Sequence, residues 1–422
     1  MILESCLCRG KSASGMIEME SDFSLLVLTL GIVILMTILI RGGLRRMPVP
    51  CLVGFIVLGM IIRTADYRWG FMTQQFHSTF GILANIGIIF LLFRVGLESN
   101  LTKLRRQLGR ASTIWIGDVS LSGGLGFVAA YFLLGLTLVQ SLFVAVALTA
   151  TSVAISVGVW HEAKALKSPN GQLLVDLADM DDISGIFLMA ILFSVAPLLT
   201  NSGGEALAPT VGKAVGLSLA KFIGFSGICI LFSRYVERHI TAFFKKLQPI
   251  PGQTVALAGF GVIIAALAGL IGFSVALGAF FAGLVFSRDP QAVKLDTPFT
   301  ILYDFIAPFF FINIGLNMSP DISTTGILMV VVLVIVAFAG KMLGAGASAL
   351  ATTSWSGALL LGISMVPRAE ITMIIMQRGL DLGDWAVPPN VFSAMVILSL
   401  VTAIVSPIVL RTLLKRWHPR KE

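Results

Sequence analysis

Thirteen stretches of the chain are long and apolar enough to cross a lipid bilayer, and no other feature restricts the fold as strongly. A spanning helix needs about 20 apolar residues, because the hydrocarbon core is about 30 Å thick. The predicted spans are residues 22–41, 48–63, 80–97, 111–136, 138–160, 170–198, 210–235, 253–271, 273–287, 299–317, 323–350, 355–379 and 389–414. Only 12% of the 422 residues are charged, compared with about 25% in an ordinary soluble domain. The sequence therefore predicts an all-α polytopic membrane protein.

The loops between the spans alternate in charge, which predicts the orientation of the protein. One set contains the basic segments RGGLRRM, TKLRRQLGR, HEAKALK, RYVERHITAFFKK and LLKRWHPRK and the nearly balanced RDPQAVK, whereas the other set is acidic or neutral. Loops rich in lysine and arginine stay in the cytoplasm. We therefore expect residues 1–21 outside, residues 415–422 in the cytoplasm, and a multi-pass protein of the inner (cytoplasmic) membrane. The net charge of +8 is explained by these loops, and we assign no nucleic-acid partner.

Similar glycine patterns recur seven spans apart. Residues 54–59 read GFIVLG and residues 278–283 read GAFFAG, while residues 90–98 read FLLFRVGLE and residues 309–317 read FFFINIGLN. Because seven is odd, the two copies must have opposite orientations in the membrane. Inverted repeats are typical of secondary transporters, whose binding site lies near the bilayer midplane between interrupted helices.

Two spans carry signals for such an interruption. Residues 138–160 contain a cluster of hydroxyl groups, which compete for backbone hydrogen bonds within a helix. These hydroxyls belong to Thr149, Thr151 and Ser152. Residues 355–379 contain Pro367, which cannot donate a backbone hydrogen bond, followed by Arg368 and Glu370. We expect the two breaks to occupy equivalent places in the two repeats, to cross, and to direct half-helix ends at an ion.

The span within Leu173–Val195 carries four aspartates in its first half. They are Asp176, Asp179, Asp181 and Asp182. A carboxylate near the bilayer centre costs roughly 2.5–3.5 kcal/mol even on a lenient scale, so several of them indicate a function. Adjacent residues on a helix point about 100° apart. We therefore expect one of Asp181 and Asp182 to face a water-filled cavity and bind a cation or a proton, while the other faces a positive partner, for which Lys341 is the candidate.

Several charged residues also admit a purely structural interpretation. Lys341 and one aspartate could form a fixed ion pair that holds two helices together. Asp176 and Asp179 could form a funnel that attracts cations, or could only complement the dipole at the start of their helix.

Two further pairs are interpreted as mainly structural. Arg368 and Glu370 are expected to support the second break as a mutual or cross-helix ion pair. Arg94 and Asp118, which lie in neighbouring spans, are expected to neutralise each other.

The segments ALTATSVAI, GQLLVDLADMDDISG, VALGAFFAGLVFS, FFFINIGLN and MVPRAE resemble the second family of monovalent cation:proton antiporters, which includes Nap-type sodium/proton antiporters and Kef-type membrane domains. The resemblance covers Ser24 to Leu414 and implies a single antiporter domain, 22–414, with the sodium/proton antiporter fold. It further implies a scaffold and dimer part at 22–97 and 253–317, an ion-carrying core at 111–198 and 323–414, and a linker helix at 210–235.

The same resemblance assigns roles to individual residues. Asp182 corresponds to the essential carboxylate that carries cation and proton, and Asp181 to a neighbour that pairs with a lysine, here Lys341. Na⁺ would then bind at Asp182 and Asp181, and the presence of two acids implies electrogenic exchange. Ala369 replaces the glycine of the usual PRGE pattern.

The expected function is a secondary active antiporter that exchanges Na⁺ or Li⁺ for H⁺ by alternating access, as a homodimer in a lipid bilayer. A K⁺/H⁺ antiporter of the same fold is the nearest alternative, and a passive channel is another. A distant alternative is an intramembrane aspartyl protease, although its paired acids should come from two helices. Four cysteines and four histidines show no metal-ligand spacing, so we expect no cofactor.

Overall fold

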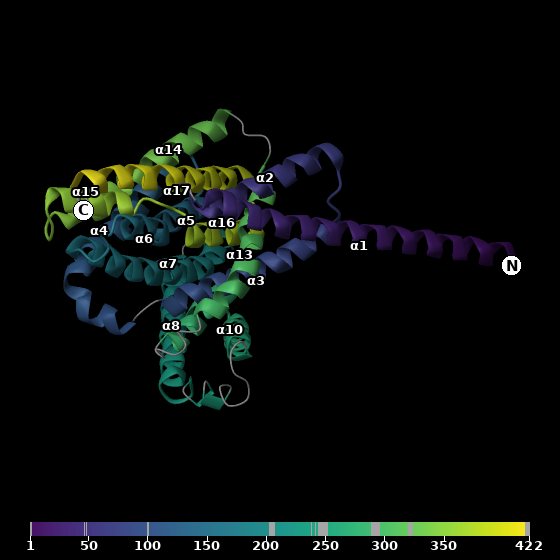
Figure 1. The fold of residues 1–422 in the computed structure, drawn as a ribbon, viewed down its shortest axis with the longest axis horizontal. Coiled ribbons are helices and arrows are strands. Elements are labelled where there is room, and N and C mark those ends of the chain that lie inside the picture. Colours follow the sequence, from purple (N-terminus) through teal and green to yellow (C-terminus); the bar gives the residue numbers. More distant parts are fainter. Residues whose placement is uncertain are drawn as a thin grey trace.

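The computed structural model describes residues 2–45, 47, 49–98, 101–201, 207–237, 239–240, 242–243, 252–287, 296–319 and 324–417. This part of the chain is helical and contains no strand, which confirms the predicted all-α class (Figure 1). The elements are α1 (Ile2–Leu44), α2 (Cys51–Trp69), α3 (Gln74–Glu98), α4 (Leu101–Val128), the π-helical turn η1 (Ala129–Leu133), α5 (Leu138–Thr149), α6 (Val153–Glu162), α7 (Pro169–Asn201), α8 (Leu207–Tyr235), α10 (Gly252–Leu270), α11 (Val275–Phe286), α13 (Asp296–Leu316), α14 (Thr324–Lys341), the π-helical turn η2 (Met342–Ala347), α15 (Trp355–Ser364), α16 (Glu370–Leu382) and α17 (Pro389–Trp417).

Each of the thirteen predicted spans overlaps one of these helices or a broken pair of them. Within the described residues, nine segments are long and apolar enough to cross a membrane, and three shorter apolar helices accompany them. The chain is therefore a multi-pass membrane protein, while thirteen crossings stay a prediction. Helix α1 begins at Ile2 rather than at residue 22, and the predicted tail at 415–422 lies outside the described residues beyond Trp417.

The helices pack as two groups. The first group consists of α2, α3, α10, α11 and α13, and the second of α4 to α7 and α14 to α17 with both π-helical turns. Helix α8 lies between them in the packing, because it contacts α7 of the second group and α11 of the first (Figure 1). Among the described helices, no extensive packing joins a member of one group directly to a member of the other.

Helices of the first group approach one another closely at glycines. A Cβ atom on Gly96 of α3 would lie 3.0 Å from the Cα atom of Gly283 in α11. A Cβ atom on Gly59 of α2 would lie 2.9 Å from the Cα atom of Gly315 in α13. The predicted repeat matches Gly59 with Gly283 and Gly96 with Gly315, so exchanging the two halves turns one contact into the other. These contacts support the inverted repeat, which stays a prediction.

Substituting alanine for Gly96 is expected to lower the stability of the protein by about 1–3 kcal/mol, because the new methyl group collides with backbone of α11 that cannot move aside. Thermal unfolding of the detergent-purified protein measures the effect. Gly81→Ala in the same helix is the matched control, because no atom lies within 4 Å of the added methyl group. Equal melting temperatures for the two variants would contradict this account of the α3–α11 contact.

Two helices are interrupted, and their interruptions meet. Helix α5 ends at Thr149, the chain is extended at Ala150, and α6 begins at Val153. The chain leaves α15 at Ser364 and enters α16 at Glu370. The backbone N–H of Ser152 in the first break donates to the carbonyl oxygen of Pro367 in the second, at 2.8 Å. Helix α5 packs on α16 and α6 on α15, so the predicted pair of crossing discontinuous helices is confirmed.

Candidate cation-binding site

Two of the four helix ends at the crossing have a side chain of complementary charge. The guanidinium of Arg368, which is fully buried, donates to the carbonyl oxygens of Ala150 and Thr149 at the C-terminal end of α5. The carboxylate of Glu370 is at the N-terminal end of α16 and accepts a hydrogen bond from the Ser152 hydroxyl at 2.6 Å. A cation at a helix C-terminus and an anion at an N-terminus are both favoured by the helix dipole. Of the two predicted arrangements, a mutual Arg368–Glu370 ion pair is not formed, and both residues instead reach across to the other broken helix.

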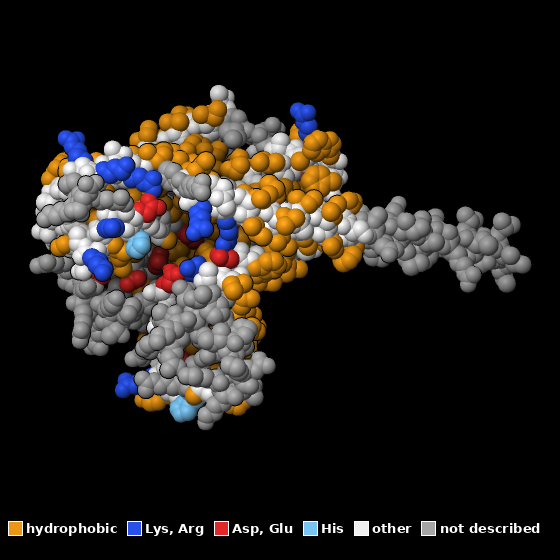
Figure 2. All heavy atoms as spheres, in the orientation of Figure 1, with side chains coloured by type: hydrophobic (Ala, Val, Ile, Leu, Met, Phe, Trp, Pro, Cys, Tyr) orange, Lys and Arg blue, Asp and Glu red, His pale blue; other side chains and the backbone are white. Residues whose placement is uncertain are grey.

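A cavity of about 490 Å³ lies beside this crossing. Four carboxylates line it, and on the face shown in Figure 2 acidic side chains gather in and around a hollow over α6, α7 and α16. The four are Glu98, Asp179, Asp182 and Glu370. No lysine or arginine is among the described lining residues. The cavity reaches the ends of α3 and α6, which adjoin loops predicted to be cytoplasmic, so it offers negative charge to ions from that side.

Asp181 and Asp182 face different surroundings, as their spacing on one helix predicts. Asp182 is partly exposed and lines the cavity. Asp181 is fully buried, and neither of its carboxylate oxygens has a hydrogen-bond partner. A buried carboxylate without hydrogen bonds is costly unless an opposite charge is near. For Asp181 that charge is Lys341, whose Nζ lies 3.8 Å from its Oδ1.

Lys341 has a closer partner than the predicted one. Its Nζ lies 2.6 Å from Oδ2 of Asp118 and donates to the carbonyl oxygen of Thr149 at 2.7 Å. Asp118 and Lys341 are both fully buried. The predicted pairing of Asp118 with Arg94 is wrong, because Arg94 lies 2.9 Å from Glu98, one turn further along its own helix. The depth of Asp118 in an apolar span was the available signal, since charges at that depth pair with one another.

Two of the three hydroxyl groups predicted as cation ligands line the acidic cavity, and the third does not. Thr151 and Ser152 line the cavity, and the Thr151 hydroxyl is buried without a hydrogen-bond partner. The Thr149 hydroxyl instead donates to the carbonyl oxygen of Val146 at 2.8 Å, within its own helix, so that residue contributes its backbone to Lys341 rather than its hydroxyl to the cavity.

The predicted approach residues also divide. Asp179 lines the cavity with Asp182, whereas Asp176 does not. Only one of the two aspartates is therefore placed to form part of a funnel.

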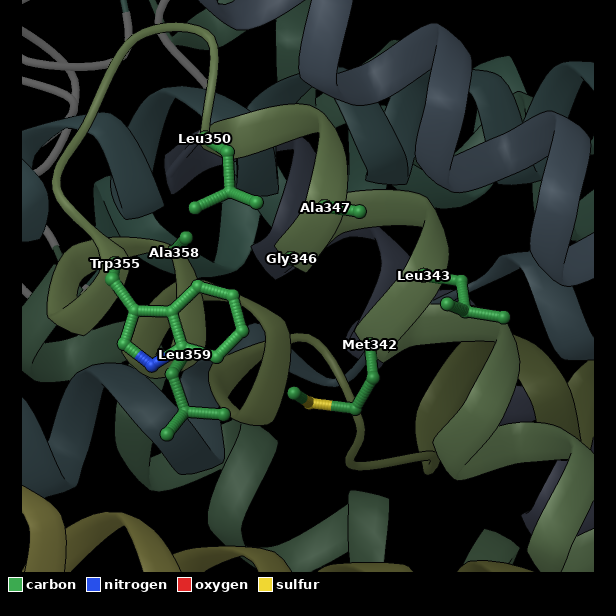
Figure 3. Close-up of a pocket in the computed structure, with 8 residues that line it drawn as sticks. All are labelled: Met342, Leu343, Gly346, Ala347, Leu350, Trp355, Ala358 and Leu359. Carbon is green, nitrogen blue, oxygen red and sulfur yellow. The ribbon is translucent and has the colours of Figure 1, made fainter.

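A second cavity, of about 220 Å³, lies between η2 and α15 (Figure 3). All eight residues around it are apolar, and Met342, Trp355 and Leu359 project into the same space. A cation needs oxygen ligands or water to replace its hydration shell. This cavity supplies no side-chain oxygen, so it is not a candidate for ion binding.

Comparisons with known proteins identify what this arrangement resembles. A family model described as "Sodium/hydrogen exchanger, transmembrane" matches residues 31–416. The high-affinity Na⁺/H⁺ antiporter NhaS3 of Synechocystis is 26% identical over 374 residues, which cover 87% of this chain and 78% of that protein. The K⁺/H⁺ antiporter subunit KhtU of Bacillus subtilis is 27% identical and covers 84% of this chain and 85% of its own length. The structure of the sodium proton antiporter MjNhaP1 from Methanocaldococcus jannaschii superposes with a TM-score of 0.68 at 15% identity, over 93% of this chain and 97% of that one, which shows a shared fold.

Proposed function

Because the chain belongs to the transmembrane sodium/hydrogen exchanger family, we propose that it is a secondary active antiporter that exchanges Na⁺ or Li⁺ for H⁺ by alternating access. The observation that carries the proposal is the placement of Asp182 in an open acidic cavity beside two crossing helix breaks. Relatives named as Na⁺/H⁺ antiporters, including one from Enterococcus hirae that is 26% identical over 89% of this chain, support the choice of sodium.

A single carboxylate can couple the two ions. A cation bound at Asp182 and a proton bound there each neutralise the same negative charge, so the two exclude one another. The Thr151 hydroxyl, which has no hydrogen-bond partner, lines the same cavity as Asp182, whereas Asp181 adds its negative charge from the buried side of the helix. If the site can turn from one side of the membrane to the other only when a cation or a proton has neutralised its charge, each turn carries one of the two ions. The protein then exchanges one ion for the other without a separate gate for each.

The two groups of helices are proposed to be the fixed and moving parts. The scaffold and dimer part comprises 22–97 and 253–317, the ion-carrying core 111–198 and 323–414, and the linker helix 210–235. The grouping of the helices by packing supports this division. Within the described part of the chain few hydrogen bonds join the two groups, so few need to break for one group to slide on the other. Three of them are Asn317 Nδ2 to Gln377 Oε1 at 3.1 Å, Arg378 to Asn85 Oδ1 at 2.8 Å and the Ser319 backbone N–H to Ser393 Oγ at 3.1 Å.

The proposal also covers the subfamily, the oligomeric state and the membrane orientation of the chain. The chain is assigned to the second family of monovalent cation:proton antiporters, as a homodimer in the inner (cytoplasmic) membrane, with residues 1–21 outside and residues 415–422 in the cytoplasm. The segments that carry the resemblance and the alternation of loop charge support these assignments.

A K⁺/H⁺ antiporter is the second candidate. The Bacillus subtilis relative is named for K⁺/H⁺ exchange, and the cavity is large enough to admit a hydrated cation of either size. An intramembrane aspartyl protease is not supported, because Asp181 and Asp182 are adjacent on one helix and family membership is that of transporters.

Reconstitution in liposomes tests the proposal. With an outward proton gradient and a pH-sensitive dye inside, Na⁺ and Li⁺ are expected to collapse the gradient while K⁺ has little effect. An imposed membrane potential should change the rate, since one net charge gains about 2.3 kcal/mol per 100 mV. Collapse by K⁺ alone would identify the second candidate, indifference to the potential would remove the electrogenic assignment, and failure to move Na⁺ uphill would identify a passive channel.

A further inference from the structure

One buried ammonium group lies between two buried carboxylates. Lys341 is within 2.6 Å of Asp118 and within 3.8 Å of Asp181, and all three side chains are almost completely excluded from solvent. If all three groups are ionised, the cluster carries one net negative charge. Lys341 donates a hydrogen bond to the nearer carboxylate, that of Asp118. The Asp181 carboxylate has no hydrogen-bond partner.

The packing of α4 against the end of α14 builds this contact. Gly340 and Gly344 flank Lys341, and a Cβ atom on Gly344 would lie 2.8 Å from the Cα atom of Asp118. A Cβ atom on Gly340 would lie 3.0 Å from the Cα atom of Ser122. Small residues let membrane helices approach at the backbone. The π-helical turn η2 starts directly after Lys341, and such turns occur frequently at functional sites.

We propose that Asp118 is a positioning residue that sets the apparent cation affinity of the Asp181–Asp182 site by competing with Asp181 for Lys341. This inference rests on the proposed antiport function and adds to it the residue that controls cation binding. While Lys341 rests on Asp118, the two adjacent aspartates keep their negative charge available for a cation. When the cation leaves, Lys341 can move to Asp181 and neutralise it.

The geometry allows this exchange without rearrangement of the backbone. Both carboxylates already lie within 4 Å of the same nitrogen atom, so a small movement of the lysine side chain changes its partner. The long lysine side chain carries its charge on rotatable bonds, which suits such a shift. The hydrogen bond from Lys341 to the Thr149 carbonyl, at the start of the first break, links the same nitrogen to the crossing.

The substitution Asp118→Asn in the full-length protein tests the inference. Asparagine keeps the shape but not the charge, so Lys341 is left with Asp181 as its only anionic partner. The Na⁺ concentration for half-maximal exchange in liposomes is expected to rise about tenfold, which corresponds to 1.4 kcal/mol, while the maximal rate falls much less. Asp118→Glu should return the half-maximal concentration toward that of the unmodified protein.

Asp304→Asn is the matched control. It removes an aspartate from another membrane helix, α13, where Asp304 forms an ion pair with Arg41 that is also 2.6 Å long but lies outside the site. Its half-maximal Na⁺ concentration should equal that of the unmodified protein. An unchanged half-maximal Na⁺ concentration for Asp118→Asn would overturn the inference. The Asp118–Lys341 ion pair would then only hold α4 and α14 together.

A binding measurement separates this inference from the proposed function. Na⁺ that binds the folded protein raises its melting temperature, and the midpoint of that rise reports affinity without transport. A shifted midpoint in Asp118→Asn supports the role of Asp118 even if no exchange is seen, a result that would contradict the antiport function alone. If Asp118→Asn does not fold, Asp118→Ser, which also removes the negative charge, provides the same midpoint, and an unshifted value for it would overturn the inference.

Discussion

Replacing Asp182 by asparagine is expected to abolish cation/proton exchange. Asp182 is the partly exposed member of the aspartate pair and lines the acidic cavity. Asparagine has the same size but takes up neither a proton nor the charge of a cation, so the ion cannot be neutralised at the site. A loss of about 3 kcal/mol in binding corresponds to about a 100-fold lower exchange rate below saturation. The rate of Na⁺-driven collapse of a pH gradient in liposomes measures it.

Two further variants make the result specific to Asp182. Asp182→Glu keeps a carboxylate and should retain part of the rate, whereas the control Asp304→Asn should retain all of it. Full exchange by Asp182→Asn would remove Asp182 from the ion site.

Replacing Arg368 by methionine is expected to produce the largest loss of stability. Arg368 donates to the carbonyl oxygens of Ala150 and Thr149, and the whole side chain is buried. Its removal leaves the Ala150 carbonyl without this donor, at about 1–3 kcal/mol for a buried unpaired acceptor, while the Thr149 carbonyl keeps its hydrogen bond from Lys341. The melting temperature of the detergent-purified protein should fall by more than that of any surface arginine variant.

Arg378→Met is the control for this loss. Arg378 is partly exposed, forms a longer ion pair, 3.5 Å from Asp381, and donates one hydrogen bond to Asn85, so its removal should cost only about 1 kcal/mol. Arg368→Lys keeps the charge but offers one nitrogen in place of the guanidinium fork, and its melting temperature should lie between the two. Equal melting of Arg368→Met and Arg378→Met would show that the crossing does not depend on Arg368.

The helices and their breaks could be predicted from sequence because both are local properties. Apolar runs of spanning length fix the helices, and Pro367 interrupts the second broken helix because it has no N–H to donate. The different surroundings of Asp181 and Asp182 also follow from the helical repeat alone. These features require no knowledge of which helices are neighbours.

The partners of the deep charges could not be predicted, because they depend on which helices touch. The sequence predicts Asp181 as the partner of Lys341. Gly340 and Gly344 bring α4 so close to the end of α14 that Asp118 is the nearer carboxylate. Arg368 and Glu370 are two residues apart, but each contacts the first break rather than the other, which the sequence leaves open as a cross-helix arrangement. The ion pair Arg94–Glu98 can be predicted from sequence, since residues four apart on a helix are neighbours.

The hydrogen bonds across the two helix breaks have a mechanical consequence. Ser152 depends on the carbonyl of Pro367, and Ala150 depends on the guanidinium of Arg368, so each unwound segment holds polar groups of the other. Hydrocarbon offers no water to replace a lost partner. Pulling the two segments apart would strand buried donors and acceptors on both. Any displacement that turns Asp182 toward the opposite side of the membrane must therefore carry both broken helices together, as one rigid body whose stiffness comes from the absence of solvent.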